Sequence, residues 1–207
     1  MSKRPLLLIA CGALAHEVMA TLRMSGSEDI AVQCLPAKLH NRPALIPEAV
    51  RGKIRAEREN FEKIFVLYGD CGTGGLLDMV LEEEGVERIG GAHCYEFFAG
   101  SLAFTEISEA EPCSFYLTDF LVRHFQRLVI EGLGIDRHPE LLPMYFGNYK
   151  QLVYLAQTRS PQREAEARAA AERLGLEYVY RYTGFGDLGR SIREQAGEAA
   201  VPKLAAE

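Results

Sequence analysis

Three short apolar runs in this chain each lead into a cysteine. The pairs of run and cysteine are Leu6–Ala10 with Cys11, Ile64–Tyr68 with Cys71, and Ile89–Ala92 with Cys94. Each run has the length and composition of a buried strand, so each cysteine is expected just past a carboxyl end. In an open parallel sheet, ligands bind at that edge. Three thiols delivered to one edge therefore predict a cysteine-ligated metal site.

Thiolate sulfur is a strong ligand for zinc and for iron–sulfur clusters. The three cysteines are far apart in the sequence, so the site is built from distant loops and is not a zinc ribbon. Three protein ligands leave a fourth position open for water, substrate or another residue. We expect zinc on Cys11, Cys71 and Cys94, and a [4Fe-4S] cluster on the same residues is the alternative. The alternative to a metal site is that the three cysteines are only small, buried hydrophobic side chains.

Two neighbouring residues could fill the fourth position or move protons. His93 directly precedes Cys94, and Glu17 lies one to two helical turns beyond Cys11. Both residue types carry out general acid–base catalysis. The alternatives are a loop histidine and a carboxylate on a helix surface. His40 follows the expected strand Ala31–Leu35 and could face the same edge, whereas Cys34 in that strand is expected in the core.

A glycine-rich turn follows the second apolar run. Gly72, Thr73 and Gly74 follow Cys71, where the chain enters the next expected helix. Successive backbone N–H groups in such a turn form an anion-binding nest, which could hold an anionic group of a small-molecule substrate. The same field would lower the pKa of the Cys71 thiol. The turn lacks the Walker and Rossmann glycine patterns, so it does not favour a nucleotide. The alternative is a tight turn in which glycine supplies positive φ.

Strand-like and helix-like segments alternate along the chain. The expected strands are 6–10, 31–35, 64–68, 86–89, 151–156 and 176–182; the expected helices are 13–24, one opening at 47, 74–84, 94–100, 118–130, one between 160 and 175, and 188–196. Alternation of this kind predicts an α/β fold, with a mostly parallel, Rossmann-like open sheet and helices on both faces. Residues 101–138 interrupt the pattern and are expected to form a lid-like insertion.

Composition limits the classes of function. The chain has 207 residues, which predicts a single α/β domain over residues 1–198 and a frayed tail over 199–207. A net charge of −6 gives no general attraction to nucleic acid or to anionic lipid. No stretch approaches the length of a membrane helix. Five cysteines without a secretory signal predict a cytoplasmic protein with reduced thiols.

Nearly the whole chain resembles the DUF1638 domain proteins, a family of unknown function. The matching segments are Ala10–Gly12 with Glu17, Leu39–Asn41 with Pro43, Tyr68–Gly72, His93-Cys94 with Gly100-Ser101, Phe115–Thr118, and Gly147–Tyr149. The family usually has His-Asp-Cys where this chain has Ala92-His93-Cys94, so the resemblance carries no histidine role to His93. This chain also departs from the family pattern at Cys113 and after Thr118.

Members of this family often accompany corrinoid-dependent methyltransferase systems. The resemblance therefore implies a part in one-carbon metabolism, with a corrinoid protein or a methyltransferase as a partner. A zinc–thiolate site suits this chemistry because a Lewis acid can bind a thiol or a methylated substrate. The residues leave three roles open: an enzyme or accessory enzyme, an iron–sulfur protein, and a non-catalytic metal or cofactor carrier. The fourth alternative is an α/β domain that binds a small molecule and no metal.

Overall fold

The computed structural model describes residues 4–27 and 29–200, which form two compact units. The first unit combines the amino-terminal part of the chain, as far as Phe97, with the segment that begins at Phe185. The second unit is Phe98–Gly184. Each unit contains its own parallel sheet, and each is described by itself.

The sheet of the first unit has four parallel strands in the order β2-β1-β3-β4. The strands are β1 (Arg4–Cys11), β2 (Ala31–Leu35), β3 (Phe61–Leu67) and β4 (Glu87–Arg88). From Leu6 onward β1 is buried, as expected of a central strand that is covered on both faces. The carboxyl ends of β1 and β3 therefore lie side by side at one edge.

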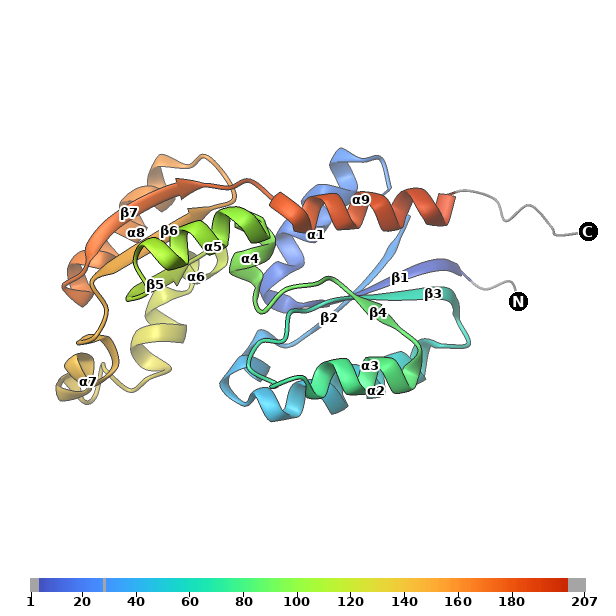
Figure 1. Cartoon of the computed structure of the whole chain (residues 1–207), viewed down its shortest axis with the longest axis horizontal. Helices are drawn as coiled ribbons and strands as arrows, with labels where there is room; N and C mark the ends of the chain where they lie inside the picture. Colours follow the sequence, from blue (N-terminus) through green and yellow to red (C-terminus); the bar gives the residue numbers. More distant parts are fainter. Residues whose placement is uncertain (1–3, 28, 201–207) are drawn as a thin grey trace, which may run out of the picture. The chain divides into compact units, whose positions relative to one another are not determined.

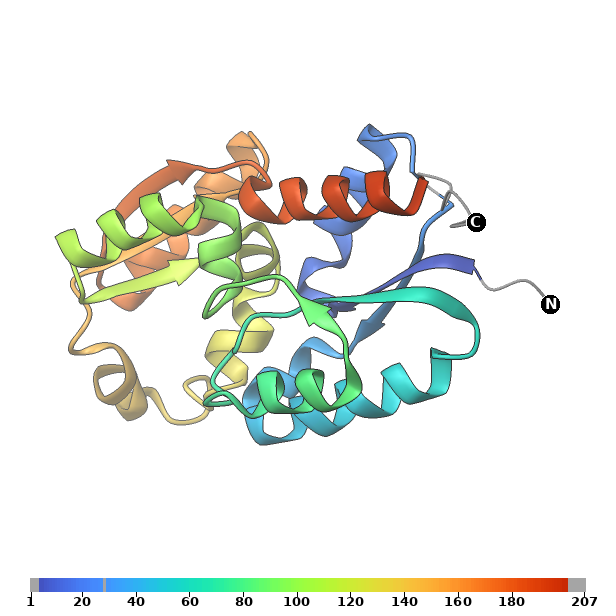
Figure 2. The same cartoon turned by 45° about the vertical axis from the view of Figure 1, so that its right-hand side comes forward.

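Helices cover both faces of this sheet (Figures 1 and 2). Figure 1 shows α1 and α9 on one face and α2 and α3 on the other. The long helices are α1 (Ala15–Met24), α2 (Ile46–Glu57), α3 (Leu76–Glu84) and α9 (Gly186–Ala200); the short ones are η1 (Gly12–Leu14), η2 (Ala37–Asn41), η3 (Pro43–Leu45) and α4 (Cys94–Ala99). The Glu84 carboxylate of α3 accepts bonds from Arg55 at 2.8 Å and Arg58 at 2.7 Å, which ties α3 to α2.

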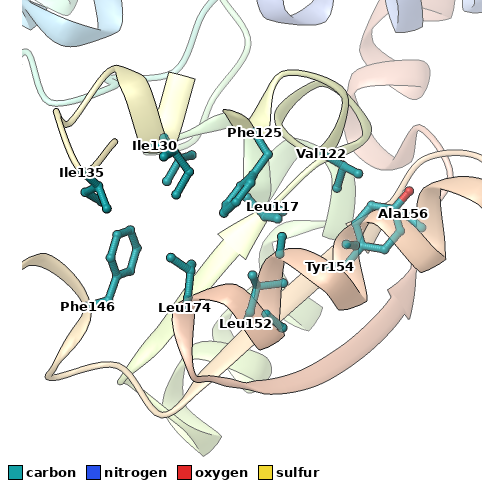
Figure 3. Packing of buried hydrophobic residues seen from close by; sticks show 14 residues of the cluster. Leu117, Val122, Phe125, Ile130, Ile135, Phe146, Leu152, Tyr154, Ala156 and Leu174 are labelled. Atoms are coloured by element: carbon teal, nitrogen blue, oxygen red, sulfur yellow. The ribbon is translucent and has the colours of Figure 1, made fainter. Parts of the chain in front are cut away.

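The sheet of the second unit has three parallel strands in the order β5-β6-β7. They are β5 (Ser114–Leu117), β6 (Gln151–Ala156) and β7 (Glu177–Tyr182). Figure 3 shows the apolar cluster on one face, where Leu117, Leu152 and Tyr154 pack with Leu174. The helices are α5 (Ser101–Ala110), α6 (Asp119–Arg123), the π-helix η4 (Gln126–Glu131), η5 (Pro139–Leu141), α7 (Leu142–Phe146) and α8 (Pro161–Leu174).

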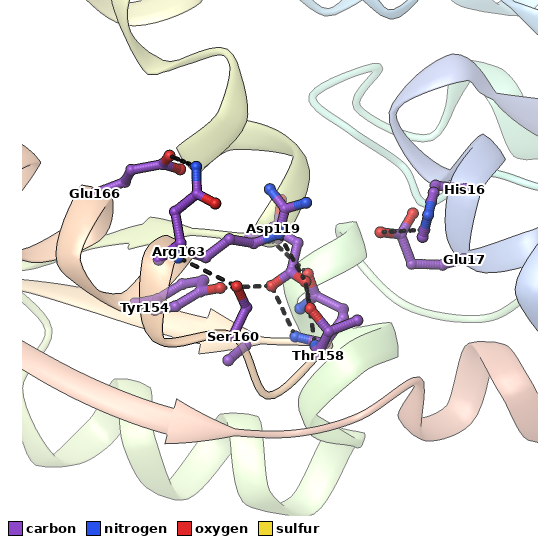
Figure 4. A network of polar contacts seen from close by, with 12 residues as sticks. His16, Glu17, Asp119, Tyr154, Thr158, Ser160, Arg163 and Glu166 are labelled. Carbon is purple, nitrogen blue, oxygen red and sulfur yellow. Dashed lines mark hydrogen bonds and ion pairs between the residues drawn. The ribbon is translucent and has the colours of Figure 1, made fainter.

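A buried carboxylate joins β5–α6 to β6 in this unit (Figure 4). Asp119 is only 2% exposed. Its oxygens accept hydrogen bonds from Tyr154 Oη at 2.7 Å, from Gln157 N at 3.0 Å, and from Thr158 N and Oγ1 at 3.1 and 2.5 Å. Arg163 Nε lies 3.8 Å from the same carboxylate. All of the groups around the Asp119 carboxylate are donors, so the network requires an acceptor at residue 119.

The predicted fold class is confirmed, since both sheets are parallel and flanked by helices. The structure also differs from the predicted arrangement, because the strands divide between two sheets and the strand expected at 86–89 is only Glu87–Arg88. Residues 101–138, expected as an insertion, supply α5, β5 and α6 to the second unit. The strand β5 was missed because its four residues are too few to show a period.

Among the described residues, no helix combines the length and the apolar character needed to cross a bilayer. Residues 201–207 of the expected tail lie outside the described residues, and residues 199 and 200 belong to α9.

Candidate metal site

A small cavity in the first unit brings the three predicted cysteines together. Its volume is about 10 Å³, and the residues lining it include Cys11, Cys71 and Cys94 with His40, Tyr68 and Phe97. The cysteines come from the end of β1, from the turn after β3, and from the first residue of α4. The structure therefore places all three thiols around one cavity, Cys11 and Cys71 after the expected strands and Cys94 after a run, Ile89–Ala92, that is not a strand.

The three thiols do not stand at the spacing of metal ligands. Within residues 4–27 and 29–200, no three His, Cys, Asp or Glu side chains stand close enough together to hold a metal ion. The three cysteines are free thiols. Binding of an ion would therefore require their side chains to turn towards it.

Cys11 is the most deeply buried of the three, at 3% exposure. Its sulfur accepts a hydrogen bond from Ala13 N at 3.3 Å, and His40 Nδ1 lies 3.8 Å from it. Burial raises the pKa of the Cys11 thiol, and the Ala13 N–H lowers it only in part. The thiol is therefore protonated at neutral pH, and a metal ion would have to displace this proton to bind.

Cys71 has an unusual backbone conformation. Its φ is 51°, and no other described residue except glycine has a positive φ. Such strain persists only where the surrounding structure imposes it, and it is concentrated at functional sites. The expectation that the glycine turn lowers the pKa of this thiol is wrong. Burial raises the pKa of Cys71 to about 11, which outweighs the hydrogen bond from the Gly69 backbone.

Backbone contacts hold the Cys71 turn against the segment that leads to Cys94. Asp70 N donates to Gly91 O at 3.2 Å, and Cys71 N donates to Ala92 O at 2.8 Å. Arg88 strengthens this arrangement, because its Nη1 donates to Ile89 O at 2.8 Å and to Gly91 O at 3.2 Å. Two cysteines from separate loops are thereby kept at one place.

Gly69 is required for this close approach. A Cβ atom at Gly69 would lie 3.0 Å from backbone atoms of Ala92 and His93, which cannot move aside as a side chain could. We expect Gly69→Ala to separate the two loops, destabilise the fold by about 1–3 kcal/mol and lower metal affinity at least about tenfold. Urea unfolding and zinc titration measure the two effects.

Gly52→Ala is the matched control for this substitution. Gly52 lies in α2, and a Cβ atom at this position would meet no neighbouring group within 4 Å. Alanine is expected to stabilise the helix by up to about 1 kcal/mol and to leave zinc affinity unchanged. Equal affinities for both alanine variants would contradict the role given to Gly69.

The predicted anion nest is filled by the chain's own carboxylate. Asp70 Oδ1 accepts from Thr73 Oγ1 at 2.6 Å and from Gly75 N at 2.8 Å, and Oδ2 accepts from Gly74 N at 3.1 Å. These bonds, with that of Thr73 first, lower the pKa of Asp70. With Asp70 in place, the N–H groups of Gly74 and Gly75 are not open to an anionic substrate.

The two candidates for proton transfer have different surroundings. Glu17 is buried at 2% exposure, and its carboxylate is near enough to Cys94 to contribute, after burial and the other two cysteines, to the raised pKa of that thiol. His16 Nδ1 lies 3.9 Å from Glu17 Oε1 (Figure 4). The exposed His93 packs against Tyr95, with ring centroids 5.7 Å apart, and is not part of the cavity lining.

Two aromatic residues complete the cavity. The His40 ring stacks on Tyr68 with centroids 6.1 Å apart, and burial lowers its pKa. The Tyr68 hydroxyl is buried, and no described atom completes a hydrogen bond to it. Burial and the nearby Cys11 thiol raise the Tyr68 pKa, although that sulfur does not reach hydrogen-bond geometry. Sequence reasoning placed His40 at this edge but counted Tyr68 only as a strand residue.

Cys34 is exposed, so the expectation that it belongs to the core is wrong. It lies on β2, which is an edge strand of the sheet and has a neighbour on one side only. Cys113 lies outside the first unit, just before β5. Neither cysteine lines the cavity.

A family model described as "Protein of unknown function (DUF1638)" matches residues 34–192. The matched segment contains His40, Tyr68, Cys71 and Cys94, and Cys11 precedes it. No curated protein is similar enough to the chain to match it.

Proposed function

This chain belongs to the DUF1638 family of proteins of unknown function, and from that premise we propose that it binds zinc through Cys11, Cys71 and Cys94. One observation carries the proposal: three cysteines that are distant in sequence line a single cavity in one unit. The unpartnered Tyr68 hydroxyl in the same lining supports it, because buried polar atoms normally have a partner.

The size of the cavity favours a single ion over a cluster. About 10 Å³ is near the lower limit for one water molecule. A [4Fe-4S] cluster contains eight atoms, so the loops would have to open to admit it. Zinc also suits thiolate ligands and needs no redox chemistry. The iron–sulfur cluster on the same cysteines therefore stays the second candidate.

For the biological role we propose an enzyme or accessory enzyme in one-carbon metabolism that works beside a corrinoid protein or methyltransferase in the cytoplasm. This part rests on the family resemblance alone. The bound zinc would act on a small-molecule substrate, and Glu17, whose charge contributes to the raised pKa of Cys94, would move a proton. A non-catalytic metal carrier is the alternative, and it should release zinc readily to a chelator, whereas an enzyme should retain it.

The test is the metal content of protein purified without oxygen. We expect about one zinc per chain and no visible absorbance, as for other closed or three-cysteine zinc sites. If the protein instead contains iron with sulfide and is brown, the site holds an iron–sulfur cluster and not zinc. If the protein binds neither zinc nor iron after reconstitution, the three cysteines only line a cavity and the proposal is wrong.

A further inference from the structure

Two of the three cavity cysteines are partly exposed. They are Cys71 and Cys94, whereas Cys11 is buried. The sulfur of Cys11 also accepts the hydrogen bond from Ala13 N at 3.3 Å. A molecule that approaches from solution therefore meets Cys71 or Cys94 before Cys11.

The segments that carry Cys71 and Cys94 are in direct backbone contact. Cys71 N donates to Ala92 O at 2.8 Å. A Cβ atom at Gly69 would lie 3.0 Å from the Cα atom of His93, the residue before Cys94. A disulfide forms without large backbone movement only between cysteines whose main chains are held near each other. This pair meets that requirement through two fixed turns.

The backbone of Cys71 distinguishes it from the other cysteines. Its φ is 51°, and among the described residues only glycines share a positive φ with it. Cys71 also lies in a turn between a buried strand and a helix, at the carboxyl edge of a parallel sheet, where such sheets present their reactive groups. Backbone strain of this kind is concentrated at functional sites. Cys71 is therefore the better candidate for an attacking thiol.

The cavity also holds a donor for a sulfur that becomes charged. The buried Tyr68 hydroxyl lines the cavity, and no described atom completes a hydrogen bond to it. A hydroxyl can donate to a thiolate while it forms. Burial raises the pKa of the Cys94 thiol, and the charge of Cys71 adds more to this rise than the charge of Cys11. Of the two, Cys71 thus acts more strongly on Cys94.

We infer that Cys71 and Cys94 are a redox-active thiol pair, which a small external disulfide such as oxidised glutathione converts into one intramolecular disulfide. The Cys71 sulfur gives up its proton and attacks one sulfur of the external disulfide, whose S–S bond breaks and releases one thiol. The Cys94 sulfur then gives up its proton and attacks the Cys71 sulfur of the mixed disulfide, which releases the second thiol. Two cysteine thiols are oxidised, and one external disulfide is reduced to two thiols.

This pair goes beyond the proposed zinc site and does not need a bound ion. Two thiols are enough for the reaction, whereas no three metal-binding side chains in the described ranges stand close enough to hold an ion. Thiolates bind metals and disulfide sulfurs do not replace them. Oxidation of the pair would therefore remove two of the three proposed zinc ligands, so that zinc binding would depend on redox conditions.

The test equilibrates the full chain, freed of metal by a chelator, with mixtures of reduced and oxidised glutathione. Remaining thiols are blocked with an alkylating reagent, and mass spectrometry of the chain and of its peptides counts and locates the disulfides. Burial raises the pKa of both thiols, so exchange is slow at neutral pH and each mixture is followed until it no longer changes. We expect the wild type to lose two of its five thiols to a disulfide between Cys71 and Cys94.

Two variants separate the roles of the thiols. Cys94→Ser should stop the reaction halfway, with glutathione attached to Cys71. Cys34→Ser is the control, because Cys34 is exposed and does not line the cavity, and it should form the same disulfide as the wild type.

The wild type alone decides whether the pair exists. The inference is overturned if oxidised glutathione leaves Cys71 and Cys94 of the wild type unlinked, and Cys94→Ser without glutathione on Cys71 would reject Cys71 as the attacking thiol. A chain that forms the disulfide but never binds zinc would reject the proposed function and support the pair. A chain that binds zinc but forms no disulfide would do the reverse.

Discussion

Cys71→Ser is expected to lower zinc affinity about 100- to 1,000-fold, because zinc binding of roughly 10–16 kcal/mol is shared among four coordination positions. The loss should be this large because serine supplies a hard, neutral oxygen where the site has a soft thiolate. The backbone of residue 71 is held by the bond from its N–H to Ala92 O, so the turn should be retained. Competition with a zinc chelator gives the affinity.

Cys34→Ser is the matched control, since Cys34 is exposed and does not line the cavity. It should bind one zinc with wild-type affinity. A full equivalent of zinc at unchanged affinity in Cys71→Ser would reject the shared site. Loss of zinc from Cys34→Ser would show that the wrong thiols had been assigned.

We expect Asp119→Ala to lower the free energy of unfolding by about 3–5 kcal/mol. The alanine removes the acceptor for Tyr154 Oη and for two backbone N–H groups, and it leaves Arg163 without its carboxylate. Buried donors without an acceptor cost about 1–3 kcal/mol each before the chain relaxes. Chemical denaturation, followed by circular dichroism, measures the change.

Asp136→Ala provides the comparison within the same unit. Asp136 is 34% exposed in its side chain and pairs only loosely with Arg137, at 3.9 Å. Surface pairs of this kind contribute about 0–1 kcal/mol, so the control should be close to wild type. If Asp119→Ala loses no more stability than Asp136→Ala, the network does not hold β5–α6 to β6.

The sequence was informative where several residues repeat one pattern. Apolar runs of five or more residues predicted β1, β3 and β6, and a cysteine after each of two such runs indicated the edge where the cavity lies. Pro161 after Ser160 predicted the start of α8, where Ser160 Oγ accepts from Arg163 N. These signals are local, so a single sequence is enough to show them.

Features that depend on tertiary contacts were not visible in the same way. The glycine turn after Cys71 has the composition of an anion nest, but the sequence does not show that Asp70 would occupy it. The field of that turn was expected to lower a thiol pKa, whereas burial by neighbouring elements raises it. Cys34 resembles a core residue, and only the strand order shows that β2 lies at an edge.

The first unit is discontinuous, and this affects the order in which the chain can fold during synthesis. Its sheet strands and all three cavity cysteines precede residue 98, but α9 follows the whole second unit. Leu188 and Ile192 of α9 are fully buried, and α9 contacts α1, β1 and β3. A ribosome must therefore translate the entire second unit before the helix that completes the first can pack. Until then the nascent thiols are in an unfinished fold, and any metal that they capture early is bound before its final surroundings exist.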